Sequence, residues 1–276
     1  MNFFKWLGGL FYHVPPKKLK IGLALGSGGA KGFAELGALK AFEENDIEFD
    51  VIAGASIGSI IGAFYADGYT SDNIYNLISG LGLKDLLSGV PYNMDMTSVQ
   101  SVIDREIGYK EIQELKKPFK AVATEIESGE EKVFDAGNTA IALCASSCFP
   151  PFFKPVYIDG ARYVDGAFSN SIPADRVREM GADYVVGIDL ANHEAKPSIL
   201  SRIFPTYKAK VKEPWSKGYH NSDVMLHPDL SEYQSTSYRK GAEIYDIGYK
   251  HALKFIAKIK QDIENLKKTK KKIKKK

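Results

Sequence analysis

Two glycine-rich turns, each between an apolar run and a helical pattern, constrain the fold more than any other feature. Residues 19–25 (LKIGLAL) are nearly all apolar, and the turn GSGGAKG at 26–32 leads from them into apolar residues at helical spacing. Residues 50–54 repeat this order, with the turn GASIG at 54–58 and an apolar stretch over 59–66. Strands that pass through tight turns into helices predict a mostly parallel central sheet that helices cover on both faces, a three-layer α/β/α fold.

The rest of the chain continues this alternation. Apolar and β-branched runs predict further strands at 119–124, 132–134, 156–158, 162–164 and 184–188. Helical periodicity predicts helices at 139–147 and 231–266, and an interrupted helical region at 71–115 with loops around 80–82 and 89–95. The Asp159-Gly160 pair predicts a hairpin turn. Residues 192–222 have weak periodicity and are predicted to form a mobile excursion.

Charge divides the chain into a body and two basic ends. The formal net charge is +3, but residues 1–20 and 267–276 together hold twelve lysines and no acid, so residues 21–266 carry −9. We expect an apolar and aromatic N-terminal segment at 1–18, one large domain at 19–266 and a lysine-rich tail at 267–276. A length of 276 residues is sufficient for one large α/β domain.

The two cysteines, Cys144 and Cys148, bear on the compartment. Their spacing of four places them on one helical face, where we expect them to be buried as small apolar side chains. They cannot form a disulfide framework, which favours a reducing, cytoplasmic location. Two such ligands make a poor metal site, and we expect no metal or cofactor. The N-terminal segment makes a poor signal peptide, and no apolar run reaches 18 residues.

The turn at 54–58 carries the strongest functional signal. Gly54-Ala55-Ser56-Ile57-Gly58 has the G-x-S-x-G form of a nucleophile elbow. In such an elbow a sharp strand-to-helix turn exposes the serine oxygen at its tip, and glycines are needed where other backbone comes close. Since an apolar strand precedes this turn and an apolar helix follows it, we predict that Ser56 is a nucleophile.

The turn at 26–32 predicts an anion site at the start of a helix. A P-loop requires G-x-x-x-x-G-K-[ST], whereas here Phe33 follows Lys31-Gly32, and the G-x-G-x-x-G spacing is also not met. Nucleotide binding is therefore disfavoured. Because successive strands of a parallel sheet end at the same edge, this turn lies near the elbow, and an oxyanion hole fits it better.

A nucleophilic serine needs a base, and two Asp-Gly pairs are candidates. Asp159 lies between two short strands and is interpreted as the hairpin turn, which leaves Asp165, before Gly166-Ala167, as the better base. None of the five histidines lies in a constrained motif: His13, His193, His220, His227 and His251. The order Ser…Asp…His is still available through any of the last four, so a three-membered triad stays open.

At this point the chain resembles the patatin-like phospholipase family. The resemblance rests on Ser27-Gly28-Gly29-Ala30-Lys31-Gly32, the elbow at 54–58 and Asp165-Gly166-Ala167. It extends to the segment ASSCFP at 145–150 and to Asn170 and Pro173, and it runs from about residue 20 to 188, with a fainter match at 223–228. The chain is most similar to compact bacterial members and to the esterase domain of neuropathy target esterase.

The resemblance implies a lipid acyl hydrolase with a Ser-Asp dyad and no catalytic histidine. Ser56 would be the nucleophile, Asp165 the general base, and Gly28 and Gly29 the oxyanion-hole donors. Ser27 stands where many members have glycine, and Lys31 where many have arginine. A catalytically silent lipid-binding or scaffold protein of the same fold, and an ordinary Ser-His-Asp hydrolase, remain alternatives.

In a protein that acts on lipid esters, the basic ends could bind a membrane surface. Lysines attract an anionic bilayer surface, and the aromatic N-terminal residues suit an interface. We therefore expect peripheral contact with the inner face of the membrane. A solvated tail without a partner is the alternative, and no nucleic-acid motif supports nucleic-acid binding. The oligomeric state is not accessible from the sequence.

Overall fold

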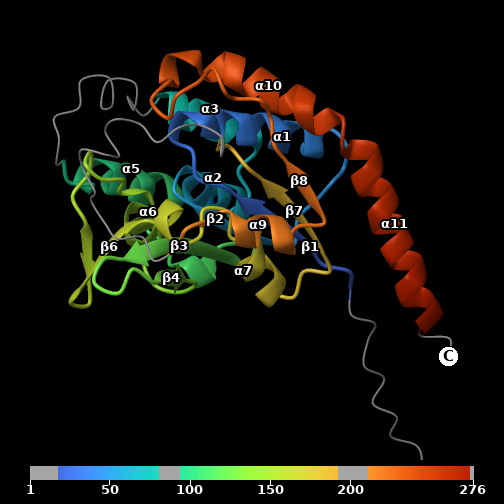
Figure 1. Ribbon diagram of the computed structural model, residues 1–276, viewed down its shortest axis with the longest axis horizontal. Coiled ribbons are helices and arrows are strands. Elements are labelled where there is room, and N and C mark those ends of the chain that lie inside the picture. Colours follow the sequence, from blue (N-terminus) through green and yellow to red (C-terminus); the bar gives the residue numbers. More distant parts are fainter. Residues whose placement is uncertain (1–17, 81–93, 192–210, 274–276) are drawn as a thin grey trace, which may run out of the picture.

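The computed structural model describes residues 18–80, 94–191 and 211–273. At its centre lies one mixed sheet, which within the described residues has eight strands in the order β5-β6-β3-β2-β1-β7-β8, with β4 paired to β3 (Figure 1). Five strands form the parallel part: β1 (Ile21–Leu25), β2 (Val51–Ala55), β3 (Phe119–Glu125), β7 (Tyr184–Ile188) and β8 (Val224–Leu226). Three strands form the antiparallel part: β4 (Glu131–Phe134), β5 (Val156–Ile158) and β6 (Ala161–Asp165).

Helices cover both faces of this sheet, as the sequence predicts, and the three-layer α/β/α fold is confirmed (Figure 1). One face carries α1 (Phe33–Glu43), α2 (Ile57–Ala66), α3 (Ser71–Gly80) and α10 (Gly241–Leu253). The other carries α7 (Ala174–Glu179) and α9 (Ser216–Asn221). Alternate strand residues serve the two faces: Leu23 and Leu25 join the larger core cluster, whereas Ala24 packs with Val177 of α7.

The remaining helices flank these layers. Among the described residues they are α5 (Thr97–Ile107), α6 (Thr139–Ser147) and α11 (Ile256–Ile273). Short 3-10 turns are found at η3 (Gly29–Gly32), η4 (Ile112–Glu114), η5 (Gly166–Phe168) and η6 (Tyr238–Lys240). Cys144 and Cys148 are buried and unbonded to each other, as expected. In the described part of the chain, no helix combines the length and the apolar character needed to cross a bilayer.

Several local predictions hold, and others fail for physical reasons. The hairpin at Asp159-Gly160 joins β5 to β6, and both of its residues have positive φ. The single helix predicted at 231–266 is wrong in two respects. Helix α10 begins only at Gly241, after turns, and the chain bends between α10 and α11 at Lys254 and Phe255, whose N–H groups bond three residues back. The apolar spacing continues across this bend and therefore hides it.

Short elements were missed where the sequence offers little periodicity. These are α7, β8 and α9, and α9 lies inside the excursion predicted at 192–222. Residues 192–210 of that excursion, the loop predicted at 80–82 beyond Gly80, most of the loop predicted at 89–95, and the N-terminal segment up to residue 17 lie outside the described residues. Helix α11 crosses the predicted boundary at residue 267 without interruption.

Close backbone contact joins α1 to α10. A Cβ atom built on Gly248 would lie 2.0 Å from the carbonyl oxygen of Ala34, and one on Gly37 would lie 2.0 Å from that of Tyr245. Since each glycine of one helix faces backbone of the other, the two helices approach more closely than larger side chains allow. Through this contact α10 packs on α1, the helix that follows β1 and the Gly-rich turn.

Gly248→Ala is expected to lower the free energy of unfolding by about 1–3 kcal/mol, because the new methyl group meets backbone that must shift. The control is Gly80→Ala at the end of α3, where nothing lies within 4 Å of the added atom. Urea denaturation of both variants measures the effect. Equal stability of the two would contradict the close contact.

Candidate active site

The sheet brings two strand ends together over β3. Strand β2 runs parallel to β3 and ends at Ala55, opposite Val122. Strand β6 runs antiparallel to β3 and ends at Asp165, opposite Ala123. Strands β2 and β6 lie on opposite sides of β3, and their carboxyl ends are level with adjacent residues of β3. Ser56, the residue after β2, therefore comes to lie beside Asp165.

The backbone at Ser56 makes the sharp turn that the motif predicts. Ser56 has φ 55° and ψ −128°, an uncommon conformation for a residue with a side chain, and α2 begins at the next residue. Its N–H donates to Ser146 Oγ at 3.0 Å, and Ser146 Oγ in turn donates to Val122 O at 2.6 Å. A Cβ atom on Gly54 would lie 2.2 Å from Gly58 O, so the turn requires glycine there.

Ser56 and Asp165 are in direct contact. Ser56 Oγ donates to Asp165 Oδ2 at 2.6 Å, and Asp165 Oδ1 accepts the Ala167 N–H at 2.8 Å. The backbone of Asp165 is held by Thr124, whose Oγ1 donates to Asp165 O at 2.9 Å. Asp165 is 1% exposed and Ser56 is 9% exposed. The pair is thus shielded from solvent, and Ser56 is the more accessible of the two residues.

Burial sets the proton affinity of Asp165. Removal from water raises the pKa of its carboxyl from 3.8 to about 7, and the hydrogen bonds from Ser56 and Ala167 only partly oppose this rise. A carboxylate with a pKa near 7 accepts a proton much more readily than an exposed aspartate does. The arrangement can therefore remove a proton from the Ser56 hydroxyl near neutral pH.

The Gly-rich turn has two N–H groups that face no acceptor among the described residues. They belong to Gly28 and Gly29, which line the same cavity as Ser56. The flanking N–H groups are occupied: Ser27 N donates to Ser171 O at 2.9 Å, and Ala30 N donates to Ser235 O at 2.8 Å. The turn can thus present two backbone donors to an anion in the cavity.

The other motif residues support this geometry. Gly32 packs against Ile57 and Gly58 against Leu25, so that the two turns touch each other. Gly166, the residue after Asp165, lies against Val122. Lys31 is half-buried, and its burial lowers the pKa of its ammonium group, although the nearby Asp189 acts in the opposite direction.

Glu35 is a residue of this region that the motifs did not reveal. Its side chain is completely buried on α1, and Oε1 accepts the Gly26 N–H at 2.6 Å. Burial raises the pKa of Glu35 well above its ordinary value, with Asp189 adding to the effect and the Gly26 N–H opposing it. Through this hydrogen bond Glu35 holds the first glycine of the turn. The residues beside Glu35 in the sequence are apolar and belong to no motif, so the sequence does not indicate this role.

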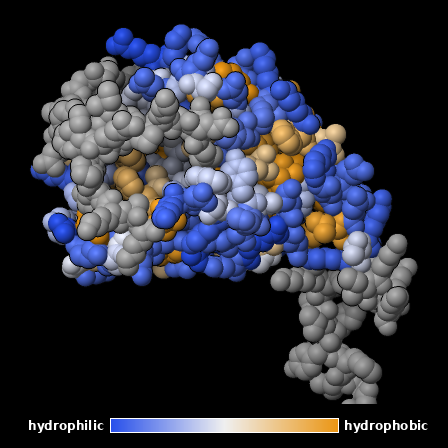
Figure 2. All heavy atoms as spheres, viewed as in Figure 1, coloured by the Kyte–Doolittle hydropathy of each residue, from blue (hydrophilic) through white to orange (hydrophobic). Residues whose placement is uncertain are grey.

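A largely apolar cavity of about 400 Å³ opens at the pair. Its walls come from both turns, from the described residues before α5 and after α6, and from the segments around α9 and η6. The apolar lining includes Ile57, Ile60, Met96, Phe149, Phe152, Phe153 and Trp215. Figure 2 shows the face of the molecule seen in Figure 1, where apolar surface is confined to patches among hydrophilic side chains.

The described histidines have partners elsewhere. His220 Nδ1 is bonded to Ser216 O, and His227 Nδ1 lies 2.8 Å from Tyr219 Oη and 3.3 Å from Asp189 Oδ2. His251 Nε2 accepts the His227 N–H. Among the described residues, the carboxylate of Asp165 bonds to Ser56 and to the Ala167 N–H, with no histidine between. His13 and His193 lie outside the described residues.

Comparison with known proteins decides the family. The family model described as patatin-like phospholipase matches residues 23–178, more than half of the chain. The chain belongs to the patatin-like phospholipase family. The members of this patatin-like family are generally lipid acyl hydrolases.

Its relatives differ in length. Patatin-like phospholipase domain-containing protein 6 of Homo sapiens is 30% identical over 234 residues, which cover 78% of this patatin-like chain but 16% of that protein. An uncharacterized NTE family protein of Mycobacterium tuberculosis is 29% identical over 185 residues, covering 65% of the chain and 51% of the relative. The crystal structure of VipD from Legionella pneumophila has the same fold, with a TM-score of 0.51 and 13% identity over 88% of this chain and 67% of that one.

Because the pKa of Asp165 is raised in the folded protein, we predict that the free energy of unfolding depends on pH. Between about pH 4 and 7 the folded state keeps a proton that the unfolded state has lost, so the free energy of unfolding falls as the pH rises through this window. Asp165→Asn removes this titration. We expect the stability of the variant relative to the natural protein to rise from pH 4.5 to pH 8, by at most roughly 1.4 kcal/mol per unit of pKa difference. Urea denaturation of both proteins at the two pH values measures it, and a constant difference would contradict the raised pKa.

Proposed function

We infer that this protein is a serine acyl hydrolase that cleaves carboxylic ester bonds of lipids, of phospholipase or lysophospholipase type, by a Ser56–Asp165 dyad. The observation that carries the proposal is the 2.6 Å hydrogen bond from Ser56 Oγ to Asp165 Oδ2 at the base of an apolar cavity. Residues 19–266 would then form one hydrolase domain.

In the first half-reaction Asp165 accepts the proton of Ser56 while Oγ attacks the ester carbonyl carbon. The negative charge that develops on the carbonyl oxygen is stabilised by the N–H groups of Gly28 and Gly29. When the tetrahedral intermediate collapses, the bond to the alcohol oxygen breaks, and the proton on Asp165 passes to that leaving group. Ser56 is left as an acyl ester.

In the second half-reaction water replaces the alcohol. Asp165 accepts a proton from the water, the hydroxide attacks the acyl carbon, and the same two N–H groups stabilise the second oxyanion. Collapse then releases the fatty acid and returns the proton to Ser56 Oγ. A pKa of about 7 supports both directions of transfer, because the group exchanges its proton easily at neutral pH.

The cavity supports a lipid rather than a polar ester. Aromatic and aliphatic side chains such as Phe149, Phe153 and Ile60 line it. Burial of an acyl chain against these groups stabilises the complex by about 0.8 kcal/mol for each methylene.

Ser56→Ala is expected to abolish hydrolysis of a short-chain p-nitrophenyl ester, and Asp165→Asn to lower kcat by about 10²–10⁴-fold, since each removes one partner of the proton transfer. A fluorophosphonate probe should label the natural protein at Ser56, as measured by intact mass. Full activity of Ser56→Ala would end the proposal.

The same experiment separates the alternatives. A folded protein that neither reacts with the probe nor hydrolyses esters would be a silent lipid-binding or scaffold protein. Single substitutions of His193, His220, His227 and His251 test the Ser-His-Asp alternative. A loss of several orders of magnitude at one of them would favour a triad over the dyad.

The two basic ends of the chain support peripheral contact with an anionic membrane. Asp183, just before β7, accepts the Lys20 N–H at 2.9 Å and pairs with Lys270 Nζ at 2.6 Å. The start of β1 and the lysine-rich end of α11 therefore meet at one corner of the molecule. Lys267, Lys268 and Lys271 of α11 are exposed. In the region of α11, Figure 2 shows hydrophilic side chains around smaller apolar patches.

This corner lies at the amino-terminal edge of the sheet, whereas Ser56 lies at the carboxyl edge of β2. The two are separated by about 17 Å, the length of a five-residue strand. Contact with the inner face of a membrane through the corner would therefore leave the cavity uncovered. Each lysine near an anionic surface contributes about 1 kcal/mol.

Substitution of Lys267, Lys268 and Lys271 by glutamine is expected to weaken binding to phosphatidylserine-containing vesicles by about 10²-fold at low salt, since three attractions of about 1 kcal/mol are lost. Hydrolysis of a soluble ester should stay unchanged. The matched control replaces Lys240, Lys250 and Lys254 of the η6–α10 region, which changes the net charge equally. Vesicle co-sedimentation measures binding, and equal binding of the two variants would mean that the tail is only solvated.

A further inference from the structure

The segment after Asp165, residues 166–173, contacts three separate parts of the site. The Ala167 N–H donates to the Asp165 carboxylate at 2.8 Å. Ser171 O accepts the Ser27 N–H from the Gly-rich turn at 2.9 Å, and Ser171 N donates to Pro214 O at 3.0 Å. Pro214 lines the cavity. The position of this segment therefore sets the position of the base relative to the Gly-rich turn and to the cavity wall.

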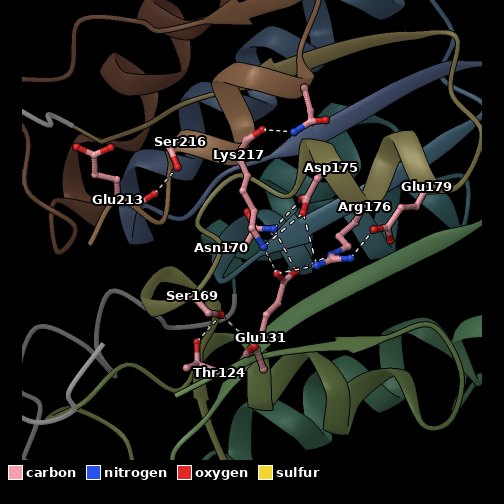
Figure 3. A network of polar contacts seen from close by, with 12 residues as sticks. Thr124, Glu131, Ser169, Asn170, Asp175, Arg176, Glu179, Glu213, Ser216 and Lys217 are labelled. Atoms are coloured by element: carbon pink, nitrogen blue, oxygen red, sulfur yellow. Dashed lines mark hydrogen bonds and ion pairs between the residues drawn. The ribbon is translucent and has the colours of Figure 1, made fainter. Parts of the chain in front are cut away.

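Asn170 lies in the middle of this segment and is completely buried. Its N–H donates to Gly166 O at 3.0 Å. Its side-chain Nδ2 donates to Glu131 Oε1 at 3.1 Å and to Asp175 Oδ1 at 2.7 Å, as Figure 3 shows. The side chain thus fastens the segment to β4 and to α7, neither of which touches the reacting groups.

Glu131, the first residue of β4, is the centre of this network. Its carboxylate accepts Arg176 Nε at 2.8 Å and Arg176 Nη2 at 3.0 Å, and Lys217 Nζ of α9 at 2.9 Å (Figure 3). The side chain is 9% exposed. Desolvation alone would raise the pKa of Glu131, but the bonds from Arg176, Lys217 and Asn170 outweigh it and hold the pKa below its ordinary value.

A buried carboxylate with these donors is fixed in direction as well as in charge. Two parallel bonds from one guanidinium orient the carboxylate plane, and Oε1, which accepts Arg176 Nε, also accepts Asn170 Nδ2. Lys217 adds α9, whose preceding residue Trp215 lines the cavity. The side chain of Glu131 therefore connects the segment 166–173, α7 and the cavity wall.

We propose that Glu131 is a positioning residue for ester hydrolysis: through Asn170 it fixes the segment 166–173, and so sets the distance between the Gly28–Gly29 donors and the Ser56–Asp165 pair. The inference rests on the proposed function. Glu131 touches no reacting atom, and its removal should change the alignment of the groups rather than the binding of the acyl chain. A misplacement of about 1 Å in such a site lowers the rate by about 10²-fold.

Glu131→Ala tests this proposal, with the rate measured per active site. A fluorophosphonate titration counts the sites that still react, and kcat for a p-nitrophenyl ester is divided by that count. We expect kcat per site to fall by about 10²-fold with KM nearly unchanged. Glu131→Gln keeps an acceptor for Asn170 but loses the charge, and should recover part of the loss, to about 10-fold below the natural protein.

The matched control is Glu179→Gln. Glu179 pairs with Nη1 of the same Arg176 but is exposed and does not contact Asn170. It should keep kcat within about twofold. A purely structural role for Glu131 predicts fewer titrated sites with an unchanged kcat per site, and that result would overturn the proposal.

Two further outcomes are informative. If Glu131→Ala does not fold, as judged by circular dichroism, Glu131→Gln decides alone, and a kcat per site equal to that of Glu179→Gln would overturn the proposal. If the natural protein neither reacts with the probe nor hydrolyses the ester, the proposed function fails, and that failure is distinguishable because it precedes any comparison of variants.

Discussion

The hydrogen bond between Ser56 and Asp165 depends on a change of strand direction inside the sheet. In a purely parallel sheet all strands point the same way, so their carboxyl ends lie side by side at one edge. Here β6 runs against β3 and β2 runs with it, so that the two carboxyl ends point toward each other over Val122 and Ala123. The antiparallel part of the sheet is therefore what supplies the aspartate to the elbow, and the hairpin at Asp159-Gly160 is what reverses the chain before it.

Two buried carboxylates show how partners decide the state of a group. Asp165 receives one hydroxyl and one backbone N–H, which do not compensate for burial, and the pKa of its carboxyl rises to about 7. Glu131 is also shielded, but a guanidinium, an ammonium group and an amide hold its pKa below the ordinary value. The first can exchange a proton near neutral pH, whereas the second stays charged and keeps its geometry. The difference lies in the donors and in the depth of burial, not in the residue type.

What the sequence predicts well is local. The apolar strands, the elbow and the Gly-rich turn each follow from neighbouring residues, because a strand, a tight turn and the start of a helix are determined over a few positions. Ser146, Glu35 and Glu131 could not be found this way, since their partners are Ser56 N, Gly26 N and Asn170 Nδ2, and the first and third pairs are far apart in the sequence. The bend between α10 and α11 escaped because the apolar spacing of the two helices is continuous. The catalytic and oxyanion roles stay proposals, and the Ser56 and Asp165 variants test the catalytic ones.

The Gly-rich turn shows how such distant contacts prepare a site. Its flanking N–H groups, at Ser27 and Ala30, are bonded to carbonyls of Ser171 and Ser235, which lie more than a hundred residues later. The two central groups, at Gly28 and Gly29, are left without acceptors among the described residues but cannot turn freely, because both neighbours are held. Donors that are fixed before the substrate arrives need no reorganisation when charge develops, and this is where their advantage over water lies. The same contacts explain why serine is accommodated at position 27. Its N–H donates to Ser171 O, and its hydroxyl lies 3.4 Å from the same carbonyl oxygen.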